Sequence, residues 1–367
     1  MRALIAPDKF KGSLRAAEVA DQLAMGLAES GVESITLPLA DGGDGSVAAA
    51  VAAGFTPQSC TVADALGRPH PATIAIKDAT AVVEVANTCG LATLPQGVLA
   101  PMNASTLGFG QAIRHALRLG ARSLVLGLGG SASTDGGIGM LAALGYGFSD
   151  AAGDAVAPSA RNLNHINRIH TCDAVSLKDL DVVLASDVTH PLTGPSGAAA
   201  VFGPQKGASI ADIDCLETGL DALVEAAERS GWNDARALAA TPGAGAAGGC
   251  GFAALLLGAT MVSGADYFLD LLGFDEYRRD ADLVITGEGR LDVQSLGGKL
   301  PVAVARRAAP TPVVAVVGRN DLGSQTGPFS EIYALADLSD VDTSQDAEAA
   351  ATLVQSIGAT IGRRLSP

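Results

Sequence analysis

Short apolar, β-branched runs recur along the chain, and each is followed within two residues by a glycine or a charged residue. Patterns typical of amphipathic helices lie between most of these runs. Strands that alternate with helices predict a parallel α/β architecture. Ligands of open parallel sheets bind outside the carboxyl ends of the strands, so the polar residues after each run are the candidate functional residues. The predicted strands are Ala3–Ala6, Ile35–Ala40, Ser123–Leu128, Val182–Ala185, Leu283–Thr286 and Val313–Val317.

Two stretches interrupt this alternation. Thr61–Val85 has the pattern of a hairpin pair around a Lys77-Asp78 turn, and residues 149–180 are polar and irregular. Antiparallel strands at this point interrupt the parallel pattern. They therefore predict that a second domain is inserted into the parallel first domain. We therefore expect a discontinuous first domain, residues 1–65 plus 270–367, and a second domain of residues 66–269. Two helices have further detail: Ser13 is expected to be the N-cap of the first helix, and 346–360 reads as a terminal helix.

Composition excludes several classes of protein. With 48% hydrophobic residues the chain of 367 residues is not disordered. Its net charge of −15 repels nucleic acid and anionic lipid, so neither is an expected partner, and a site for an anionic substrate must be locally basic. The cysteines are widely spaced and read as reduced thiols. The N-terminus turns polar too soon for a signal peptide, which predicts a cytoplasmic protein.

The segment Gly127–Gly137 is the most specific loop. It follows a predicted strand and precedes an apolar helix, and its glycines would let backbone N–H groups approach an anion. Its hydroxyls and Asp135 are candidates for phosphate or magnesium binding. Two other interpretations stay open: a connector needed for tight packing, and a dinucleotide fingerprint over Gly127–Ala132 with Asp150 as the ribose-binding acid.

Charged loops follow other predicted strands. Asp8–Arg15 carries a local excess of cations suited to phosphate or carboxylate, and Asp41–Gly45 places two carboxylates in one loop that also reads as a turn. Ser186–Pro191 and Thr286–Asp292 each place an acid after a buried strand, where it can ligate magnesium or accept a proton. Gly243–Gly248 matches a dinucleotide pattern, but no strand precedes it, so close packing is its expected role.

Phosphoryl transfer needs an anion-binding backbone, cations, carboxylates for magnesium and a base near the acceptor hydroxyl. All of these parts occur at candidate strand ends, whereas the G-x-S-x-G elbow of serine hydrolases does not occur. The loop that continues to Gly297-Gly298-Lys299 is not a Walker A motif, because Leu300 stands where Ser or Thr is required.

Taken together, these segments resemble the glycerate kinase type-1 family, the class II glycerate 2-kinases. The matching strings occur in the family's order over nearly the whole chain: 6–14, 40–46, 127–141, 187–189, 201–208, 243–252 and 282–301. The resemblance implies a two-domain α/β kinase with one flavodoxin-like domain, an inserted mixed α/β domain and an active site in the interdomain cleft. It also implies ATP and Mg²⁺ as cofactors and D-glycerate as substrate. The implied product is 2-phosphoglycerate, with 3-phosphoglycerate as the second regiochemistry and a homodimer as a candidate assembly.

Within this resemblance, residue roles are assigned from chemistry. Asp187, Asp292 and Lys9 are expected to be catalytic, with Asp187 or Asp292 as the base, and Asp187 and Glu288 are expected to bind magnesium. The residues expected to bind substrate or phosphate are Lys11, Ser13, Asp41, Asp44, Gly129, Gly130, Ser131, Ser133, Lys206, Glu288, Arg290 and Lys299. The chain departs from the family's pattern at His190, Asp44 and Thr134.

Other functions stay open at this stage. A nicotinamide-dependent dehydrogenase or a non-catalytic nucleotide-binding protein would use the Gly127 loop without Asp187 or Asp292. A kinase of the galactokinase and homoserine kinase type has a similar glycine loop, but its other motifs are missing.

One prediction follows from the cationic loop. If Lys9 binds a substrate or phosphate anion, Lys9→Ala should lower kcat/KM by about 10-fold or more, because a charge-assisted contact contributes about 1.5–3 kcal/mol. Steady-state kinetics measure this effect. Unchanged kinetics would make Lys9 a solvated surface charge.

Overall fold

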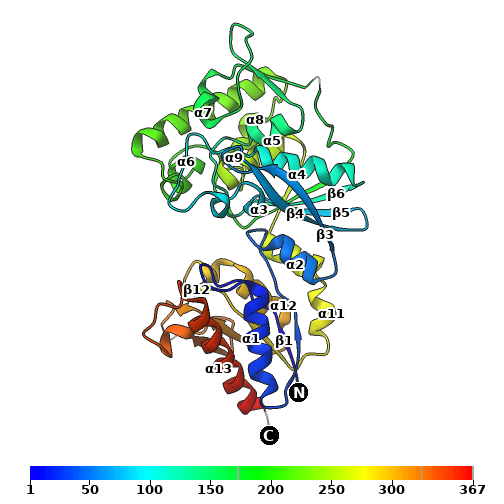
Figure 1. The fold of residues 1–367 in the computed structure, drawn as a ribbon, viewed down its shortest axis with the longest axis vertical. Helices are drawn as coiled ribbons and strands as arrows, with labels where there is room; N and C mark the ends of the chain where they lie inside the picture. Colours follow the sequence, from blue (N-terminus) through cyan, green and yellow to red (C-terminus); the bar gives the residue numbers. More distant parts are fainter. Residues whose placement is uncertain (172, 324, 366–367) are drawn as a thin grey trace. The chain divides into compact units, whose positions relative to one another are not determined.

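The computed structural model describes residues 1–171, 173–323 and 325–365, so Cys172 lies outside the described residues. The chain divides into two compact units (Figure 1). Unit 1 contains Met1–Asp41, Ala48–Gly54 and Ala265–Pro367, and unit 2 contains Gly42–Val47 and Phe55–Gly264. Residues 55–65, which the sequence analysis places with the first domain, lie in unit 2 because their strand pairs with the predicted hairpin.

Unit 1 is built on a parallel sheet with strand order β2-β1-β11-β13-β15. Numbered along the chain within this unit, that order is 2-1-3-4-5, the flavodoxin-like arrangement. The predicted flavodoxin-like parallel sheet is therefore present. Its strands are β1 (Arg2–Ile5), β2 (Glu33–Thr36), β11 (Leu283–Thr286), β13 (Val313–Val317) and β15 (Glu331–Ala334), with the short strands β12 (Arg290–Leu291) and β14 (Arg319–Asn320) beyond them.

Helices cover the sheet of unit 1. They are α1 (Ala16–Ala28), α10 (Gly264–Leu271), α11 (Phe274–Arg278), α12 (Leu300–Ala308) and α13 (Ala347–Leu365), with short 3₁₀ turns η4 (Ser295–Gly297) and η5 (Leu335–Asp337). Helix α2 (Ser46–Ala52) carries the chain between the units. Ile5, Leu23, Val316 and Val354 belong to the buried core under α1 and α13. Because a Cβ on Gly26 would lie 2.2 Å from the carbonyl oxygen of Gln355, glycine is required where these two helices touch.

The start of α1 differs from the prediction. Arg15, not Ser13, is the N-cap, and the Glu18 side chain accepts a hydrogen bond from the Arg15 backbone N–H at 2.8 Å. Ser13 lies in a tight turn in which Phe10 and Leu14 bridge each other. The chain therefore enters the helix two residues later than the sequence suggests, and Ser13 stays in the loop after β1.

Unit 2 contains a mixed sheet of order β10-β9-β6-β5-β4-β3. The pairs β3–β4 and β4–β5 are antiparallel, which confirms the predicted hairpin pair, and β5, β6, β9 and β10 run parallel. The strands are β3 (Thr56–Ala63), β4 (Pro69–Lys77), β5 (Thr80–Glu84), β6 (Ser123–Gly127), β9 (Asp181–Ala185) and β10 (Thr260–Val262), and a separate ribbon pairs β7 (Gly147–Ser149) with β8 (Arg168–His170).

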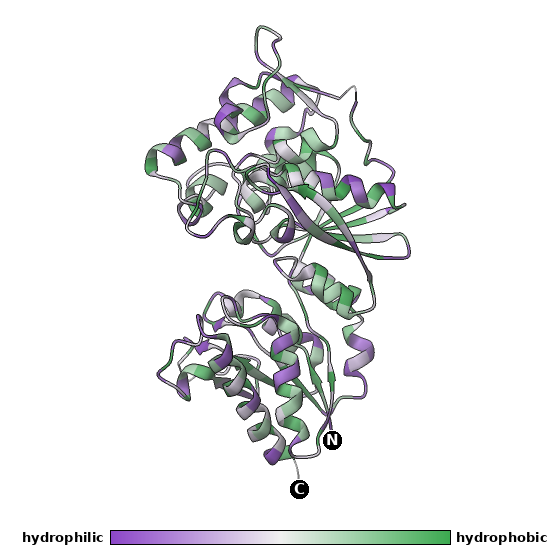
Figure 2. Ribbon diagram, in the orientation of Figure 1, coloured by the Kyte–Doolittle hydropathy of each residue, from purple (hydrophilic) through white to green (hydrophobic). Residues whose placement is uncertain are grey.

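Helices of unit 2 pack around one large core that includes Phe109, Leu126, Leu220 and Phe252. Helix α4 buries one side, Phe109 and Ile113 included, and shows both hydrophilic and hydrophobic colours in Figure 2. The helices are α3 (Ala86–Cys89), α4 (Leu107–Arg118), α5 (Ile138–Ala143), α6 (Ala198–Phe202), α7 (Ile210–Arg229), α8 (Ala235–Ala240) and α9 (Ala246–Leu256), with η1 (Leu91–Thr93), η2 (Ala160–His165) and η3 (Pro204–Lys206). Within the described ranges, no helix combines the length and apolar character needed to cross a membrane.

Candidate functional site

The loops at the carboxyl edge of unit 1 are joined to one another by backbone hydrogen bonds. Asp8 donates its N–H to the carbonyl of Gly287 at 2.8 Å, and Gly318 donates to the carbonyl of Glu288 at 3.1 Å. Ala336 then donates to Gly318 at 3.1 Å. The ladder of the sheet thus continues past β1, β11, β13 and β15, and it holds the polar residues of four loops in fixed positions.

Carboxylates gather on these loops. Burial and the negative charge of Asp41 together raise the pKa of Asp8 to about 7, and the charge of Lys9 opposes this shift. Burial also raises the pKa of Glu288 to about 7, against the Ser295 hydroxyl and the Lys299 charge. Carboxyl groups that release their protons near neutral pH are suited to accept a proton from a substrate hydroxyl.

Glu288 also has the character of a cation ligand. Its side chain is only 8% exposed, and its Oε1 has no hydrogen-bond partner among the described residues. In the described parts of the chain, three or more His, Cys, Asp and Glu side chains nowhere form a ready metal cluster. Mg²⁺ needs none, because it binds through one or two carboxylates together with water and substrate phosphates. The carboxylates of Asp8, Asp41 and Glu288 repel one another electrostatically, so a cation beside them would lower this repulsion.

Asp292 and Lys299 form a local pair in the loop after β12. The Asp292 Oδ1 accepts from the backbone N–H of Ser295 at 3.0 Å and lies 3.7 Å from the Lys299 Nζ. Burial alone would raise the pKa of Asp292, but the Ser295 hydrogen bonds and the Lys299 charge lower it. A carboxylate with a lowered pKa is a weaker proton acceptor.

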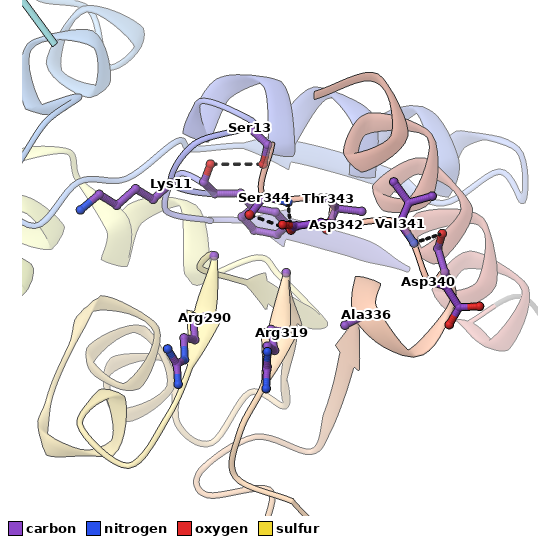
Figure 3. Close-up of a pocket in the computed structure, with 14 residues that line it drawn as sticks. Lys11, Ser13, Arg290, Arg319, Ala336, Asp340, Val341, Asp342, Thr343 and Ser344 are labelled. Carbon is purple, nitrogen blue, oxygen red and sulfur yellow. Dashed lines mark hydrogen bonds between the residues drawn. The ribbon is translucent and has the colours of Figure 1, made fainter. Parts of the chain in front are cut away.

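Arg290 is joined by a second arginine that the sequence analysis did not select. The β12–β14 pair places Arg290 opposite Arg319, and both guanidinium Nε atoms contact Asp321, at 2.6 and 2.7 Å. Both arginines line a pocket of about 530 Å³ together with Lys11 and Ser13 (Figure 3). Arg319 directly follows Gly318 at the end of a predicted strand, so the rule that selected Arg290 could also have found it.

In unit 2, the Gly127–Gly137 loop turns its polar side chains inward. Ser131 and Ser133 are buried and their hydroxyls lie 3.1 Å apart. Asp135, which is 0% exposed, accepts hydrogen bonds from the backbone N–H groups of Gly137 and Gly139 at the start of α5. The side chains of these residues therefore organise the loop, and the expected anion-binding start of α5 is already filled by Asp135.

Lys206 is also buried, not exposed to a ligand. It is 2% exposed, and its ammonium group donates to the carbonyl oxygen of Ser133. Burial lowers the pKa of Lys206 to about 8, although the negative charge of Asp135 opposes this shift. Lys206 thus stabilises the Gly127–Gly137 loop by a buried hydrogen bond to its backbone, and the sequence did not predict this burial.

Gly243–Gly249 supports the same loop. A Cβ on Gly248 would lie 2.1 Å from the carbonyl oxygen of Ser133, and Gly136 donates its N–H to Gly248 at 2.9 Å. The expected packing role of this segment is confirmed. On another side, a Cβ on Gly129 would lie 2.5 Å from the Gly43 Cα, so the Asp41–Gly45 and Gly127 loops are in close contact around Gly43.

Asp187 lies exposed at the carboxyl end of β9. Its Oδ1 accepts from the Gly264 N–H at 2.9 Å and the Ser263 hydroxyl at 3.1 Å. These bonds hold the carboxylate near the ends of β9 and β10, and its role as a magnesium ligand stays a prediction. The nearby His190 places its Nδ1 2.8 Å from the carbonyl of Ser196, which gives its ring a role within the loop.

The dinucleotide interpretation fails on geometry. Asp150 accepts from the backbone N–H groups of Ala152 and Asp154, both at 2.9 Å, in a turn after β7. It does not follow a strand of the main sheet of unit 2, so it does not take the place of a ribose-binding acid.

Paired cations and carboxylates at the edge of a parallel sheet are the parts that a phosphotransferase needs. Comparison with known proteins names the family: residues 3–366 match the model of the glycerate kinase family, and the chain belongs to it. The chain is 39% identical to the glycerate kinase of Bacillus subtilis and to the glycerate 2-kinase of Escherichia coli, in each case over 87% of this chain and 85% of the relative. The crystal structure of a Salmonella typhimurium LT2 protein described as a glycerate kinase 2 has a TM-score of 0.83 and 34% identity, covering 100% of this chain and 98% of that one. The chain is therefore a kinase, which decides against the dehydrogenase and the non-catalytic alternatives.

The raised pKa of Asp8 predicts how stability depends on pH. Folded protein keeps the Asp8 proton up to about pH 7, whereas the unfolded chain loses it near 3.8, so the free energy of unfolding falls as pH rises between these values. Asp8→Asn should remove this loss of stability, so the variant should be more stable than wild type at pH 8, by up to about 4 kcal/mol, and equal to it at pH 4.

Urea denaturation in the presence of a chelator, at several pH values, measures this difference. Asp44→Asn, on an exposed loop of unit 2, is the control and should follow the wild type. Parallel pH profiles for wild type and Asp8→Asn would contradict the account.

Proposed function

We propose that this kinase transfers the γ-phosphoryl group of ATP to the 2-hydroxyl of D-glycerate and forms 2-phosphoglycerate. The observation that carries the proposal is the placement of Asp8 and Glu288, whose pKa values are raised to about 7, beside the cations Lys9 and Lys299. The name of the Escherichia coli relative, glycerate 2-kinase, supports the choice of hydroxyl.

The residues of unit 1 can perform each part of the transfer. Lys9 and Lys11 supply positive charge for the substrate carboxylate and for phosphate oxygens. As the 2-hydroxyl oxygen bonds to the γ-phosphorus, the bond from that phosphorus to the bridging oxygen of ADP breaks, and Asp8 takes the hydroxyl proton. Asp8 can do this because its pKa of about 7 lies near the pH of the cell interior.

Magnesium is the second part of the proposal. Glu288 and Asp41 would hold the ion in unit 1, and Asp187 stays a proposed ligand in unit 2, where Ser263 and Gly264 fix one of its oxygens. When bound, magnesium neutralises charge on the phosphate oxygens.

Product analysis tests the reaction directly. Incubation with D-glycerate, ATP and Mg²⁺, followed by phosphorus NMR, should show ADP and 2-phosphoglycerate, and excess chelator should abolish turnover. Formation of 3-phosphoglycerate would contradict the regiochemistry, and full turnover in chelator would contradict the magnesium requirement.

Matched amide variants test the base. Asp8→Asn should lower kcat by about 100-fold or more, the scale expected for loss of a general base. Asp292→Asn should lower it by less than about 10-fold, because its carboxylate already serves Ser295 and Lys299. The reverse ranking, at saturating magnesium, would return the role of base to Asp292.

A further inference from the structure

The pocket of unit 1 lies where a flavodoxin-like sheet binds its ligand. Its walls come from the loops after β1, β11 and β13 and from the segment between η5 and α13. In the 2-1-3-4-5 order, the chain continues from β1 to one side of the sheet and from β11 to the other side. The order of the strands therefore reverses between β1 and β11, and doubly wound sheets bind nucleotides at such a switch point. The pocket also shares its loops with the candidate catalytic carboxylates, since Phe10 follows Lys9 and Gly289 follows Glu288.

One side of the pocket is suited to phosphates. Arg290 and Arg319 lie side by side with 66% and 69% of their side chains exposed, and Lys11 lies on the same side in Figure 3. Each guanidinium has five N–H donors, and the contact with Asp321 uses the one on Nε. Asp321 therefore holds both arginines through their Nε atoms and leaves their other N–H groups as donors for a ligand's oxygens.

The other side is suited to a nucleoside. Asp340 lines it across the pocket from Lys11 (Figure 3), and an acid in this position can accept hydrogen bonds from ribose hydroxyls. Val341, which is 50% exposed, and the buried Phe10 ring supply apolar surface for a base. Asp342 has a different role, because its Oδ1 accepts from the N–H and the hydroxyl of Ser344 and shapes the wall.

The size of the pocket favours ATP over D-glycerate as its ligand. The pocket volume of about 530 Å³ falls in the range of sites for nucleotide-sized ligands, and a three-carbon acid would leave most of it to water. Gly12 lets the loop after β1 approach the Ser344 segment closely, since a Cβ there would lie 2.5 Å from the carbonyl oxygen of Ser344.

We propose that this pocket binds the nucleoside triphosphate donor, with Arg290 and Arg319 on its phosphates, Asp340 on its ribose, and the terminal phosphate directed toward Glu288. The assignment rests on the proposed function and adds the binding site of the nucleotide to it. It also adds two binding residues, Arg319 for the phosphates and Asp340 for the ribose. Arg290 lies two residues along the chain from Glu288, so phosphate oxygens bound by Arg290 would lie near the candidate site.

Calorimetric titration of the full-length protein with ATP, and separately with inorganic tripolyphosphate, tests the assignment. Wild type should bind ATP at least about 10-fold more tightly than tripolyphosphate. Arg319→Ala should weaken both ligands by about 10-fold, as loss of a charge-assisted contact does. Asp340→Asn should weaken ATP by about 5-fold and leave tripolyphosphate no weaker, because only ATP carries a ribose. Arg363→Ala, which removes an exposed arginine of α13, is the matched control and should change neither.

Each result decides a separate point. Equal affinity of wild type for ATP and tripolyphosphate would overturn the nucleoside assignment, and unchanged ATP affinity in Arg319→Ala would overturn the pocket. These titrations need no turnover. If ATP binds through Arg319 and Asp340 while D-glycerate is not phosphorylated, the proposed function fails and the pocket assignment stands. If D-glycerate is phosphorylated while both variants keep wild-type ATP affinity, the reverse holds.

Discussion

Backbone hydrogen bonds that continue past the strand ends of unit 1 are the constraint on which its site depends. A parallel ladder normally stops where the chain turns into a loop, but here Asp8, Gly318 and Ala336 extend it by one further layer. Loops of a protein are usually its most variable and mobile parts. By fixing these loops as an edge of the sheet, the protein holds their charged side chains in set positions.

Because these loops are fixed, the carboxyl groups they carry stay in an electrostatically unfavourable arrangement. Asp8 and Glu288 are held in surroundings that raise both pKa values to about 7, and Glu288 Oε1 has no partner among the residues that the structure describes. Buried carboxylates of this kind lower the free energy of unfolding of the folded protein. Binding of a cation or of a hydroxyl donor would offset this loss of stability. The two arginines of the neighbouring pocket show the complementary arrangement, because one shared carboxylate, Asp321, holds both of them.

The sequence predicted most strands and the edge of the sheet, because β-branched runs and their polar ends are local signals. Thus Leu283–Thr286 appears as β11 at its predicted bounds, and Glu288 follows it as expected. One prediction was wrong in its bounds: β2 spans Glu33–Thr36 and not Ile35–Ala40. Burial of loop residues was not predictable. Ser131, Ser133 and Lys206 read as exposed ligands, yet Gly248 packs on their loop from far along the chain. The pKa of Asp8 likewise depends on Asp41, which only the pairing of β1 with β2 brings near.

In this account, the nucleotide binds to the loops at the carboxyl edge of the sheet of unit 1, next to the residues that react with it. Hydrogen–deuterium exchange with and without a non-hydrolysable ATP analogue and Mg²⁺ tests it most directly. The account predicts slower exchange on binding in residues 8–14, 287–292, 318–321 and 339–344. Protection confined to the Gly127–Gly137 loop, with these segments unchanged, would contradict it.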